Sequence, residues 1–232
     1  MHKKIGIIGG LSPESTVSYY LHITRTYVEK FGDDSYPEII IYSVNLEDYH
    51  RWRSENRWDL IIEDMADIAN KLQVAGADFG LIATNTMHKV FAQVQQKTTL
   101  PLLNLIDVTA GEARRKNIQT IGLIGTKYTM SEDFYRVGLK DNNLSVLVPC
   151  AEDQEIIHKI IVEELVRGKI LPQSKSAYLK IIKKLQQQGA EGVILGCTEI
   201  PLLIKQHDCD IPVIDTATIH AQAALLQAID SE

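Results

Sequence analysis

Residues 71–90 read KLQVAGADFGLIATNTMHKV, and residues 184–203 read KLQQQGAEGVILGCTEIPLL. In each stretch a helical pattern ends at a glycine, a short apolar run follows, and polar residues come directly after that run. When the two stretches are aligned on their glycines, Thr84 of the first corresponds to Cys197 of the second. Two copies of one helix–turn–strand segment predict that the chain consists of two homologous halves.

The repeat extends to other parts of the chain. The run IGIIGG at 5–10 corresponds to IGLIGT at 121–126, and LPLLNL at 100–105 corresponds to IPVIDT at 211–216. Short β-branched runs alternate with helical patterns, which is typical of an α/β fold with parallel sheets. We therefore expect two pseudo-symmetric Rossmann-like halves, each a parallel sheet flanked by helices, with the last strand and helix returning to the first half. The predicted halves are residues 1–104 with 214–232, and residues 105–213.

The expected strands are short and apolar, and each one ends at turn residues. They are 4–9, 37–44, 79–83 and 100–105 in the first half, and 120–125, 145–150, 192–196 and 211–215 in the second. The expected helices between them include 15–30, 57–75, 153–167 and 173–188.

Thr84 and Cys197 each come directly after one of these apolar strands. Ligands of open α/β sheets bind outside the carboxyl ends of the strands. We therefore expect the active site in a cleft between the two halves, with Thr84 and Cys197 facing each other across a bound molecule. A racemase needs this arrangement, because one group removes a proton from one face of a carbon and another delivers a proton to the opposite face.

Length and composition limit the classes of function. The 232 residues are enough for a buried core, and a net charge of −6 disfavours nucleic-acid binding, which needs a basic surface. No apolar run reaches the ~20 residues of a membrane span. Three cysteines without paired spacing are typical of a reducing compartment, so we expect a cytoplasmic protein. The sequence has no zinc-like spacing, P-loop or GxGxxG turn, so no metal or organic cofactor is expected.

The polar residues after the two strands are the first candidates for the site. Thr84, Asn85 and Thr86 offer amides and hydroxyls that can hold a carboxylate or an oxyanion, although Asn and Thr are also ordinary helix caps. His88, one turn further on, is expected to be a partly buried or surface histidine and not a catalytic one. Cys197 precedes a predicted helix, whose amides would lower the pKa of its thiol. The alternative is a small buried residue that fills the turn.

Glycine turns and an arginine-rich run supply further candidates. GGLSPES at 9–15 places Ser12 at a helix N-cap, either as an entry turn alone or as a contact for an anion, and Thr126 lies in the corresponding turn of the second half. YHRWRSENR at 49–57 is read as a loop beyond a strand end, where an arginine can grip a carboxylate with two hydrogen bonds. The cationic candidates, in decreasing order, are Arg51, Arg53, and then Arg167 and Lys169.

Taken together, GGLSPES at 9–15, ATNTMHK at 83–89 and GCTEI at 196–200 resemble the motifs of the aspartate/glutamate racemase family, and the resemblance covers nearly the whole chain. It implies a cofactor-independent amino-acid racemase with two Rossmann-like halves, a pair of cysteines as acid and base, and commonly a homodimer. By position, Cys197 corresponds to one of the family's cysteines. Thr84 stands where the family usually has the other.

The resemblance also implies roles for the binding residues. Asn85, Thr86 and Thr198 correspond to residues that hold the α-carboxylate and amino group of the substrate. Arg51 corresponds to the arginine that reads the distal carboxylate, and Ser12 falls in the first glycine loop. The substrate that these residues imply is a small anionic amino acid, L-aspartate or L-glutamate.

The threonine at position 84 is the main departure from the family. A hydroxyl is far less acidic than a thiol, whose usual pKa is about 8.5, so Thr84 is a poor base but can still deliver or relay a proton. The resemblance implies that the cysteine of the second half acts on the L face of the substrate, and that the chain is similar to the subset of the family with threonine in place of the first catalytic cysteine. We therefore expect two-base proton transfer at the α-carbon, with Cys197 as the base and a bias towards the L substrate. Two alternatives remain: a single-cysteine decarboxylase or isomerase of a dicarboxylate, and a catalytically weakened amino-acid-binding protein.

Overall fold

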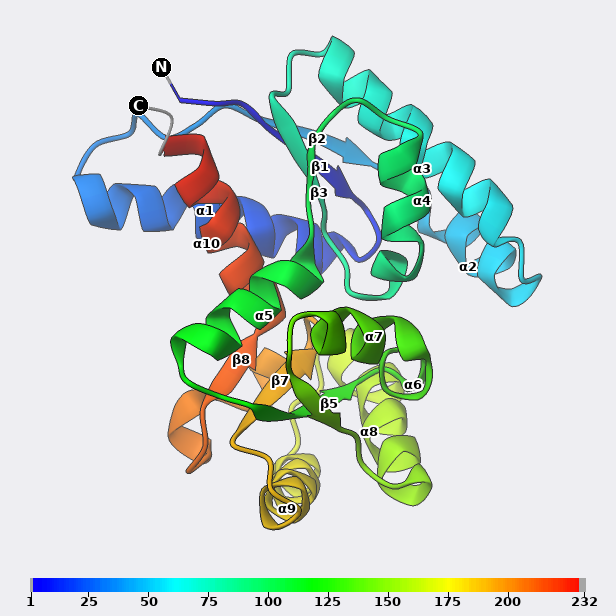
Figure 1. The fold of residues 1–232 in the computed structure, drawn as a ribbon, viewed down its shortest axis with the longest axis vertical. Helices are drawn as coiled ribbons and strands as arrows, with labels where there is room; N and C mark the ends of the chain where they lie inside the picture. The colour runs from blue at the N-terminus through cyan, green and yellow to red at the C-terminus, as the bar shows by residue number, and fades with distance from the viewer. Residues whose placement is uncertain (1, 230–232) are drawn as a thin grey trace. The chain divides into compact units, whose positions relative to one another are not determined.

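The chain divides into two α/β units, each built on its own parallel sheet. The computed structural model describes residues 2–229, and contacts within it group the chain up to Leu105 and from His220 onwards into unit 1, and Ile106–Ile219 into unit 2. Figure 1 follows the ribbon from the first strand to the last helix. Within the described part of the chain, no helix is both long enough and apolar enough to cross a membrane.

Unit 1 is built on a four-stranded parallel sheet in the order β2-β1-β3-β4. Its strands are β1 (Ile5–Gly9), β2 (Ile39–Ser43), β3 (Phe79–Ile82) and β4 (Leu102–Leu103). Its helices are α1 (Pro13–Phe31), α2 (Leu46–Ser54), α3 (Trp58–Val74), the 3₁₀ helix η1 (Thr86–Val90), α4 (Phe91–Gln96) and the second part of α10 (Thr216–Ile229). In Figure 1, α1 and α10 lie on one side of this sheet and α3 and α4 on the other. Every residue of β1 and β3 is buried, which explains their continuous apolar sequence.

The turn between β1 and α1 is fixed by a glycine and a capping serine. Gly10 has a φ of 78°, and a Cβ there would lie 2.5 Å from the backbone nitrogen of Val44. Ser12 is the N-cap of α1, and its Oγ accepts a hydrogen bond from the amide of Ser15 at 3.3 Å. Pro13 takes the first helical position, where the chain does not need its N–H. This turn places Ser12 beyond the carboxyl end of β1.

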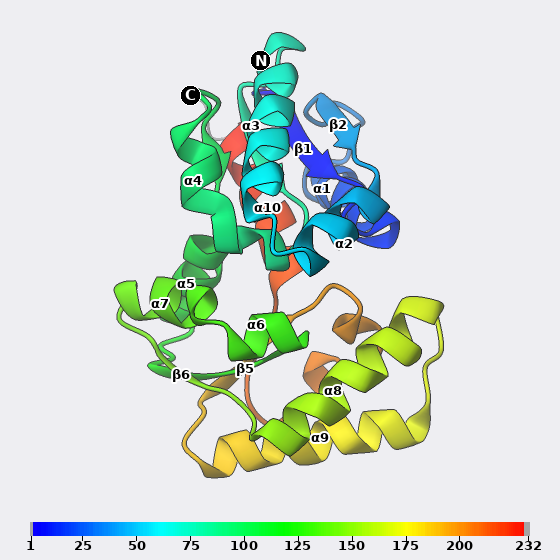
Figure 2. The ribbon, with the colours of Figure 1, turned by 90° about the vertical axis from the view of Figure 1, so that its right-hand side faces the viewer.

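Unit 2 is built on a second parallel sheet in the order β6-β5-β7-β8. Its strands are β5 (Thr120–Gly125), β6 (Ser145–Leu147), β7 (Gly192–Gly196) and β8 (Val213–Asp215). Its helices are α5 (Leu105–Arg115), α6 (Lys127–Ser131), α7 (Asp133–Asp141), α8 (Ala151–Glu163), α9 (Pro172–Gln187) and the 3₁₀ helices η2 (Leu165–Arg167), η3 (Ile200–Leu202) and η4 (Gln206–Asp208). Figure 2 shows α8 and α9 side by side.

The two sheets repeat one plan. In each, the first strand lies between the second and the third, and the fourth strand pairs with the third. All of these pairings are parallel, and the first and third strands are joined along their length. The prediction of two α/β halves, each a parallel sheet flanked by helices, is therefore confirmed.

The boundaries of the units differ from the predicted ones. β8 pairs with β7, so the last strand stays in the sheet of unit 2 and does not return to the first half. The chain leaves unit 1 at the start of α5 and comes back inside α10, where His220 is the first residue of unit 1. The return therefore lies after residue 214. Residues 1 and 230–232 of the predicted first half lie outside the described residues.

Candidate active site

The loop after β3 carries Thr84, and hydrogen bonds hold its backbone. The amide of Ala83 donates to the carbonyl of Ile8 at 3.0 Å, and the carbonyl of Ala83 accepts from the hydroxyl of Ser15 at 2.9 Å. The amide of Thr84 donates to the carbonyl of Ile82 at 2.9 Å, and the residue is half-buried. The end of β3 is thus tied both to β1 and to the first turn of α1.

The other predicted binding residues of unit 1 lie on the same turns. Asn85 is 4% exposed, and its backbone carbonyl accepts a hydrogen bond from the amide of His88 at 3.1 Å. Thr86 is the first residue of η1 and is half-buried. The hydroxyl of Ser12 donates to Glu14 at 3.2 Å in addition to capping α1. Ser12, Asn85 and Thr86 therefore follow the carboxyl ends of two paired strands, β1 and β3.

Residues 49–54 of the arginine-rich run belong to helix α2, so the interpretation of the run as a loop was wrong for Arg51 and Arg53. α2 begins after Asn45, whose Oδ1 accepts a hydrogen bond from the amide of Glu47 at 3.2 Å, and both Arg51 and Arg53 lie in its last turn. The Nη2 of Arg51 donates to Oδ1 of Asp48 at 2.7 Å, with about half of the arginine side chain exposed. A dicarboxylate that binds Arg51 would therefore compete with the carboxylate of Asp48.

The weaker cationic candidates follow a helix in the chain and not a strand. Arg167 is the last residue of η2, and Lys169 follows the left-handed Gly168 that ends this turn. Both side chains are exposed. They follow helix α8 in the chain, whereas the other predicted residues of unit 2 follow β5 and β7.

The ends of β5 and β7 lie against each other in unit 2. Gly125 pairs with Gly196, and a Cβ on Gly125 would approach the carbonyl oxygen of Gly196 to 2.9 Å, so this contact needs glycine. Thr126 follows Gly125, and as the N-cap of α6 it accepts a hydrogen bond from the amide of Thr129 at 3.4 Å. Cys197 follows Gly196. Thr126 and Cys197 therefore start from adjacent strand ends.

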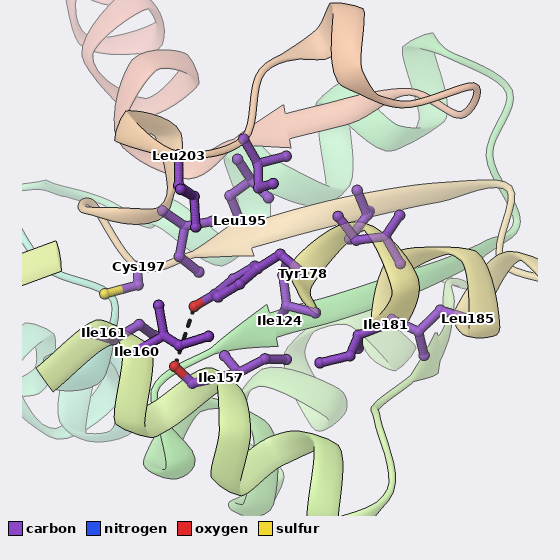
Figure 3. Close-up of a cluster of buried hydrophobic side chains, with 14 of the residues drawn as sticks. Ile124, Ile157, Ile160, Ile161, Tyr178, Ile181, Leu185, Leu195, Cys197 and Leu203 are labelled. Atoms are coloured by element: carbon purple, nitrogen blue, oxygen red, sulfur yellow. Dashed lines mark hydrogen bonds between the residues drawn. The ribbon is translucent and has the colours of Figure 1, made fainter. Parts of the chain in front are cut away.

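The thiol of Cys197 lies at the edge of an apolar cluster. The residue is 8% exposed, and Figure 3 shows it beside Tyr178 and Leu195. Its Sγ donates a hydrogen bond to Oε2 of Glu199 at 2.9 Å. The hydroxyl of Thr198 donates to the same oxygen at 3.0 Å. One carboxylate oxygen of Glu199 therefore accepts hydrogen bonds from the side chains of the two residues that precede it.

The surroundings of Cys197 hold its proton on the sulfur. Burial raises the pKa of the thiol well above its usual value, and the carboxylate of Glu199 raises it further, while the backbone amides of Glu199 and Thr198 act more weakly in the opposite direction. The expected lowering of this pKa was therefore wrong. The helix that follows is one 3₁₀ turn, η3, which is too short to supply the dipole of an α-helix. At neutral pH, Cys197 is a thiol with a carboxylate in place to accept its proton.

Glu199 is a candidate residue that the sequence interpretation missed. It is 9% exposed, and it stands two residues after the cysteine in GCTE. The signal was present in that motif, because an acidic side chain so near a thiol can reach it. A buried carboxylate in contact with a thiol at a strand end is typical of a place where protons move.

Two buried histidines lie together in unit 1. His88 and His220 are 4% and 0% exposed, and their rings meet edge to face with centroids 5.9 Å apart. Burial lowers the pKa of His88 to about 4 and that of His220 to about 3, so both rings are neutral at physiological pH. Residues 2–229 contain no group of three or more His, Cys, Asp or Glu side chains that is arranged to hold a metal ion.

These neutral histidines predict that unit 1 loses stability in mild acid. The folded pKa values lie below the usual value of 6.5, so the unfolded chain binds more protons as the pH falls from about 6.5 towards 4. Between pH 7 and pH 5 we expect each histidine to lower the free energy of unfolding by about 2 kcal/mol. Both tryptophans, Trp52 and Trp58, lie in unit 1, so their fluorescence during urea unfolding measures this change.

Two variants separate this effect from the general acid sensitivity of the chain. His88→Gln should reduce the pH dependence between pH 5 and pH 7, because one buried imidazole is gone. The matched control is His207→Gln, since His207 has 78% of its side chain exposed. An unchanged pH dependence in His88→Gln would contradict the prediction.

Known proteins similar to this chain include racemases. The broad specificity amino-acid racemase RacX of Bacillus subtilis is 26% identical, over 95% of this chain and 96% of the relative. A structure from Yersinia pestis, provisionally assigned as an Asp/Glu racemase, is 40% identical with a TM-score of 0.94, over 98% of this chain and 99% of that one. The structure of an aspartate racemase homologue from Pyrococcus horikoshii is 40% identical with a TM-score of 0.89, over 97% and 99%.

One family covers almost all of the chain. The Asp/Glu/Hydantoin racemase family matches residues 8–224. This range runs from β1 into α10 and includes both Thr84 and Cys197. The chain therefore belongs to the Asp/Glu/Hydantoin racemase family.

Proposed function

We propose that the protein is a cofactor-independent amino-acid racemase that acts on L-aspartate or L-glutamate. Family membership and the similarity to RacX, a broad specificity amino-acid racemase, support racemase chemistry. The similarity to an aspartate racemase homologue supports an acidic substrate. The observation that carries the proposal is the hydrogen bond from the Cys197 thiol to Glu199, because a base must lose its own proton before it can take one from the substrate.

In this proposal Thr84 and Cys197 act on opposite faces of the substrate's α-carbon. They follow equivalent strands of the two sheets, β3 and β7. Cys197 removes the α-proton of the L enantiomer, and Thr84 supplies a proton to the other face. Donors around the α-carboxylate stabilise the enolate-like carbanion between the two steps.

The proton transfers balance over one turnover. The Cys197 thiol gives its proton to the Glu199 carboxylate, and the resulting thiolate takes the α-proton of the substrate. The carbanion then takes the hydroxyl proton of Thr84, which forms the new C–H bond of the D enantiomer. The proton on Glu199 returns to the Thr84 alkoxide through water. At the end the thiol, the carboxylate and the hydroxyl are restored, and no other reactant is consumed.

The remaining predicted residues hold the substrate in this proposal. Hydroxyl and amide groups of both units contact the α-carboxylate and the ammonium group, and a guanidinium contacts the distal carboxylate once it has displaced Asp48. The first set is Ser12, Asn85, Thr86, Thr126 and Thr198, and the guanidinium is that of Arg51. Arg53 in the same turn of α2 is the second choice for this role.

The bias towards the L substrate takes a particular form. The two enantiomers have equal free energies, so kcat/KM for net conversion must be the same in both directions. The difference between the two enantiomers should therefore appear in the rate at which each exchanges its α-proton with solvent. Because a Thr84 hydroxyl is a poor acid and a poorer base than a thiol, the L substrate should exchange its α-proton faster than it inverts, whereas the D substrate should exchange only as it inverts.

A panel of L- and D-amino acids in deuterated water tests the proposed function. Chiral chromatography measures inversion, and NMR of the α-position measures exchange. We expect exchange and inversion with aspartate or glutamate, and faster exchange from the L side. The absence of α-proton exchange with every amino acid would reject the proposal, and release of carbon dioxide from a dicarboxylate would favour a decarboxylase in its place.

Replacing Thr84 by cysteine should raise the rate of inversion by at least about tenfold, because a thiol is a far better proton donor and acceptor than a hydroxyl. The isosteric Thr84→Val should have the opposite effect, with inversion largely lost and exchange from the L substrate retained. Steady-state inversion and exchange rates measure both effects. Equal inversion rates in wild type and Thr84→Cys would contradict the role of Thr84.

A further inference from the structure

His88 is held in one tautomer by two hydrogen bonds. One ring nitrogen, Nδ1, lies 2.8 Å from the carbonyl oxygen of Thr84, and the other, Nε2, lies 3.1 Å from the backbone nitrogen of Leu105. A backbone N–H can only donate, so Nε2 must be the unprotonated nitrogen that accepts. Nδ1 then carries the hydrogen and donates it to Thr84. Both neighbours therefore require the neutral ring with its proton on Nδ1.

This bond completes the support of the Thr84 backbone. The amide of Thr84 donates to Ile82, and the preceding carbonyl of Ala83 accepts from the Ser15 hydroxyl. The carbonyl of Thr84 is the remaining backbone polar group of the residue, and it accepts a hydrogen bond from His88, which is 4% exposed. Removal of the His88 donor would free this carbonyl and let the peptide plane after Thr84 turn.

The other end of His88 is tied to the place where the chain leaves unit 1. Leu105 is the first residue of α5 and the last residue of unit 1 before the chain enters unit 2. An amide at the start of a helix lacks a partner within the helix, and Nε2 of His88 supplies one. Phe91 stacks on the ring with centroids 5.3 Å apart and planes 7° apart. The ring therefore fixes Thr84 relative to the start of α5.

His220 makes a similar arrangement without contacting Thr84. Its Nε2 lies 3.0 Å from the carbonyl oxygen of Leu103, which can only accept, so Nε2 carries the hydrogen. Its Nδ1 then accepts from the hydroxyl of Tyr19 at 2.9 Å. His220 is thus equally buried and fully hydrogen-bonded, and it serves as a matched control for His88.

We propose that His88 is a positioning residue that orients Thr84 for proton delivery and links it to the start of α5. The inference rests on the proposed role of Thr84. Loss of the His88 bond should affect one of the two proton transfers. A Thr84 hydroxyl displaced by about an ångström delivers its proton much more slowly, whereas proton removal by Cys197 involves other residues. Loss of the His88 bond should therefore slow inversion and leave exchange of the L substrate intact.

Two substitutions of His88 each keep one of the two hydrogen bonds of the ring and remove the other. The amide of His88→Asn can occupy the place of Nδ1 and donate to Thr84, whereas the longer His88→Gln reaches the place of Nε2 and accepts from Leu105. We expect the ratio of inversion to exchange to fall at least tenfold in His88→Gln and to stay within about threefold of wild type in His88→Asn. His220→Gln should lower the urea midpoint of unit 1 without changing this ratio.

Each outcome decides the inference. A folded His88→Gln with the wild-type ratio would overturn it while leaving the proposed racemase in place. A wild type that exchanges no amino acid would overturn both. Should the variants fail to fold, nitrogen-15 NMR of the wild-type imidazoles still decides, because a proton found on Nε2 of His88 would exclude the bond to Thr84.

Discussion

Replacement of Cys197 by serine should lower the rate of inversion and of L-substrate exchange by roughly 10³-fold, within the range of 10²–10⁴ that general base catalysis usually supplies. A serine hydroxyl keeps the hydrogen bond to Glu199, so the buried carboxylate stays paired and the fold is preserved. It is nevertheless a far weaker acid than a thiol, so it cannot become the base. Inversion and exchange of aspartate and glutamate in deuterated water measure the loss.

The chain offers matched controls for this variant. Cys150 is exposed and Cys209 is half-buried, and neither follows a strand of its sheet at the position that Cys197 occupies. Cys150→Ser and Cys209→Ser, alone or together, should leave both rates within about twofold of wild type, since neither cysteine belongs to the proposed site and both changes keep the size of the side chain. Activity that survives in Cys197→Ser, or that disappears in the double control, would refute the assignment of the base.

Replacement of Glu199 by glutamine should slow the enzyme and at the same time make its cysteine more acidic. The carboxylate is a cause of the raised pKa of Cys197, so its removal lowers that pKa relative to wild type. The amide cannot accept the thiol proton, however, so we expect exchange and inversion to fall by on the order of 10². If Glu199 accepts the thiol proton, Glu199→Gln should lower the pKa of Cys197 and also slow the enzyme. If Glu199 only lies near the thiol, the lower pKa should not be accompanied by a slower rate.

The pKa of Cys197 and the exchange rate can both be measured in a protein that lacks the other two cysteines. In the Cys150→Ser/Cys209→Ser protein, Cys197 is the remaining cysteine of three, so the pH dependence of its alkylation gives its pKa. Glu199→Asp keeps the charge and shortens the side chain by one methylene, so its loss of rate should be smaller. An exchange rate in Glu199→Gln equal to or above that of wild type would show that Glu199 takes no proton from Cys197.

The fold was predictable because its information is local and is present twice. The apolar runs of β1, β3, β5 and β7 are buried over nearly their whole length, so their sequences show little alternation and were identified as strands. The return of the chain to unit 1 was misplaced, because no local pattern states which sheet the run at 211–215 joins. Its correspondence with 100–105 was the better guide, since β4 and β8 each pair with the third strand of their own sheet.

The chemistry of the site was less predictable because it depends on burial and on short turns. α2 was interpreted as a loop, since its nine residues are mostly polar, although Asn45 followed by Glu47 and Asp48 is a helix-start signal. The pKa of Cys197 had the opposite direction to the prediction. The sequence does not show that η3 lasts one turn, nor that the Glu199 side chain folds back onto the sulfur.

The path of the chain also sets the order in which the two units can fold during synthesis. Unit 2 is one continuous stretch, Ile106–Ile219, whereas unit 1 needs residues from both ends of the chain. Domains generally fold as units while the ribosome is still at work, so unit 2 is complete before the hydrogen bond between Tyr19 and His220 can form. Unit 1, whose first residues are translated first, is therefore the last unit that can complete its fold. A stop codon placed soon after Ile219 would leave unit 2 with all of its residues and unit 1 without its C-terminal helix.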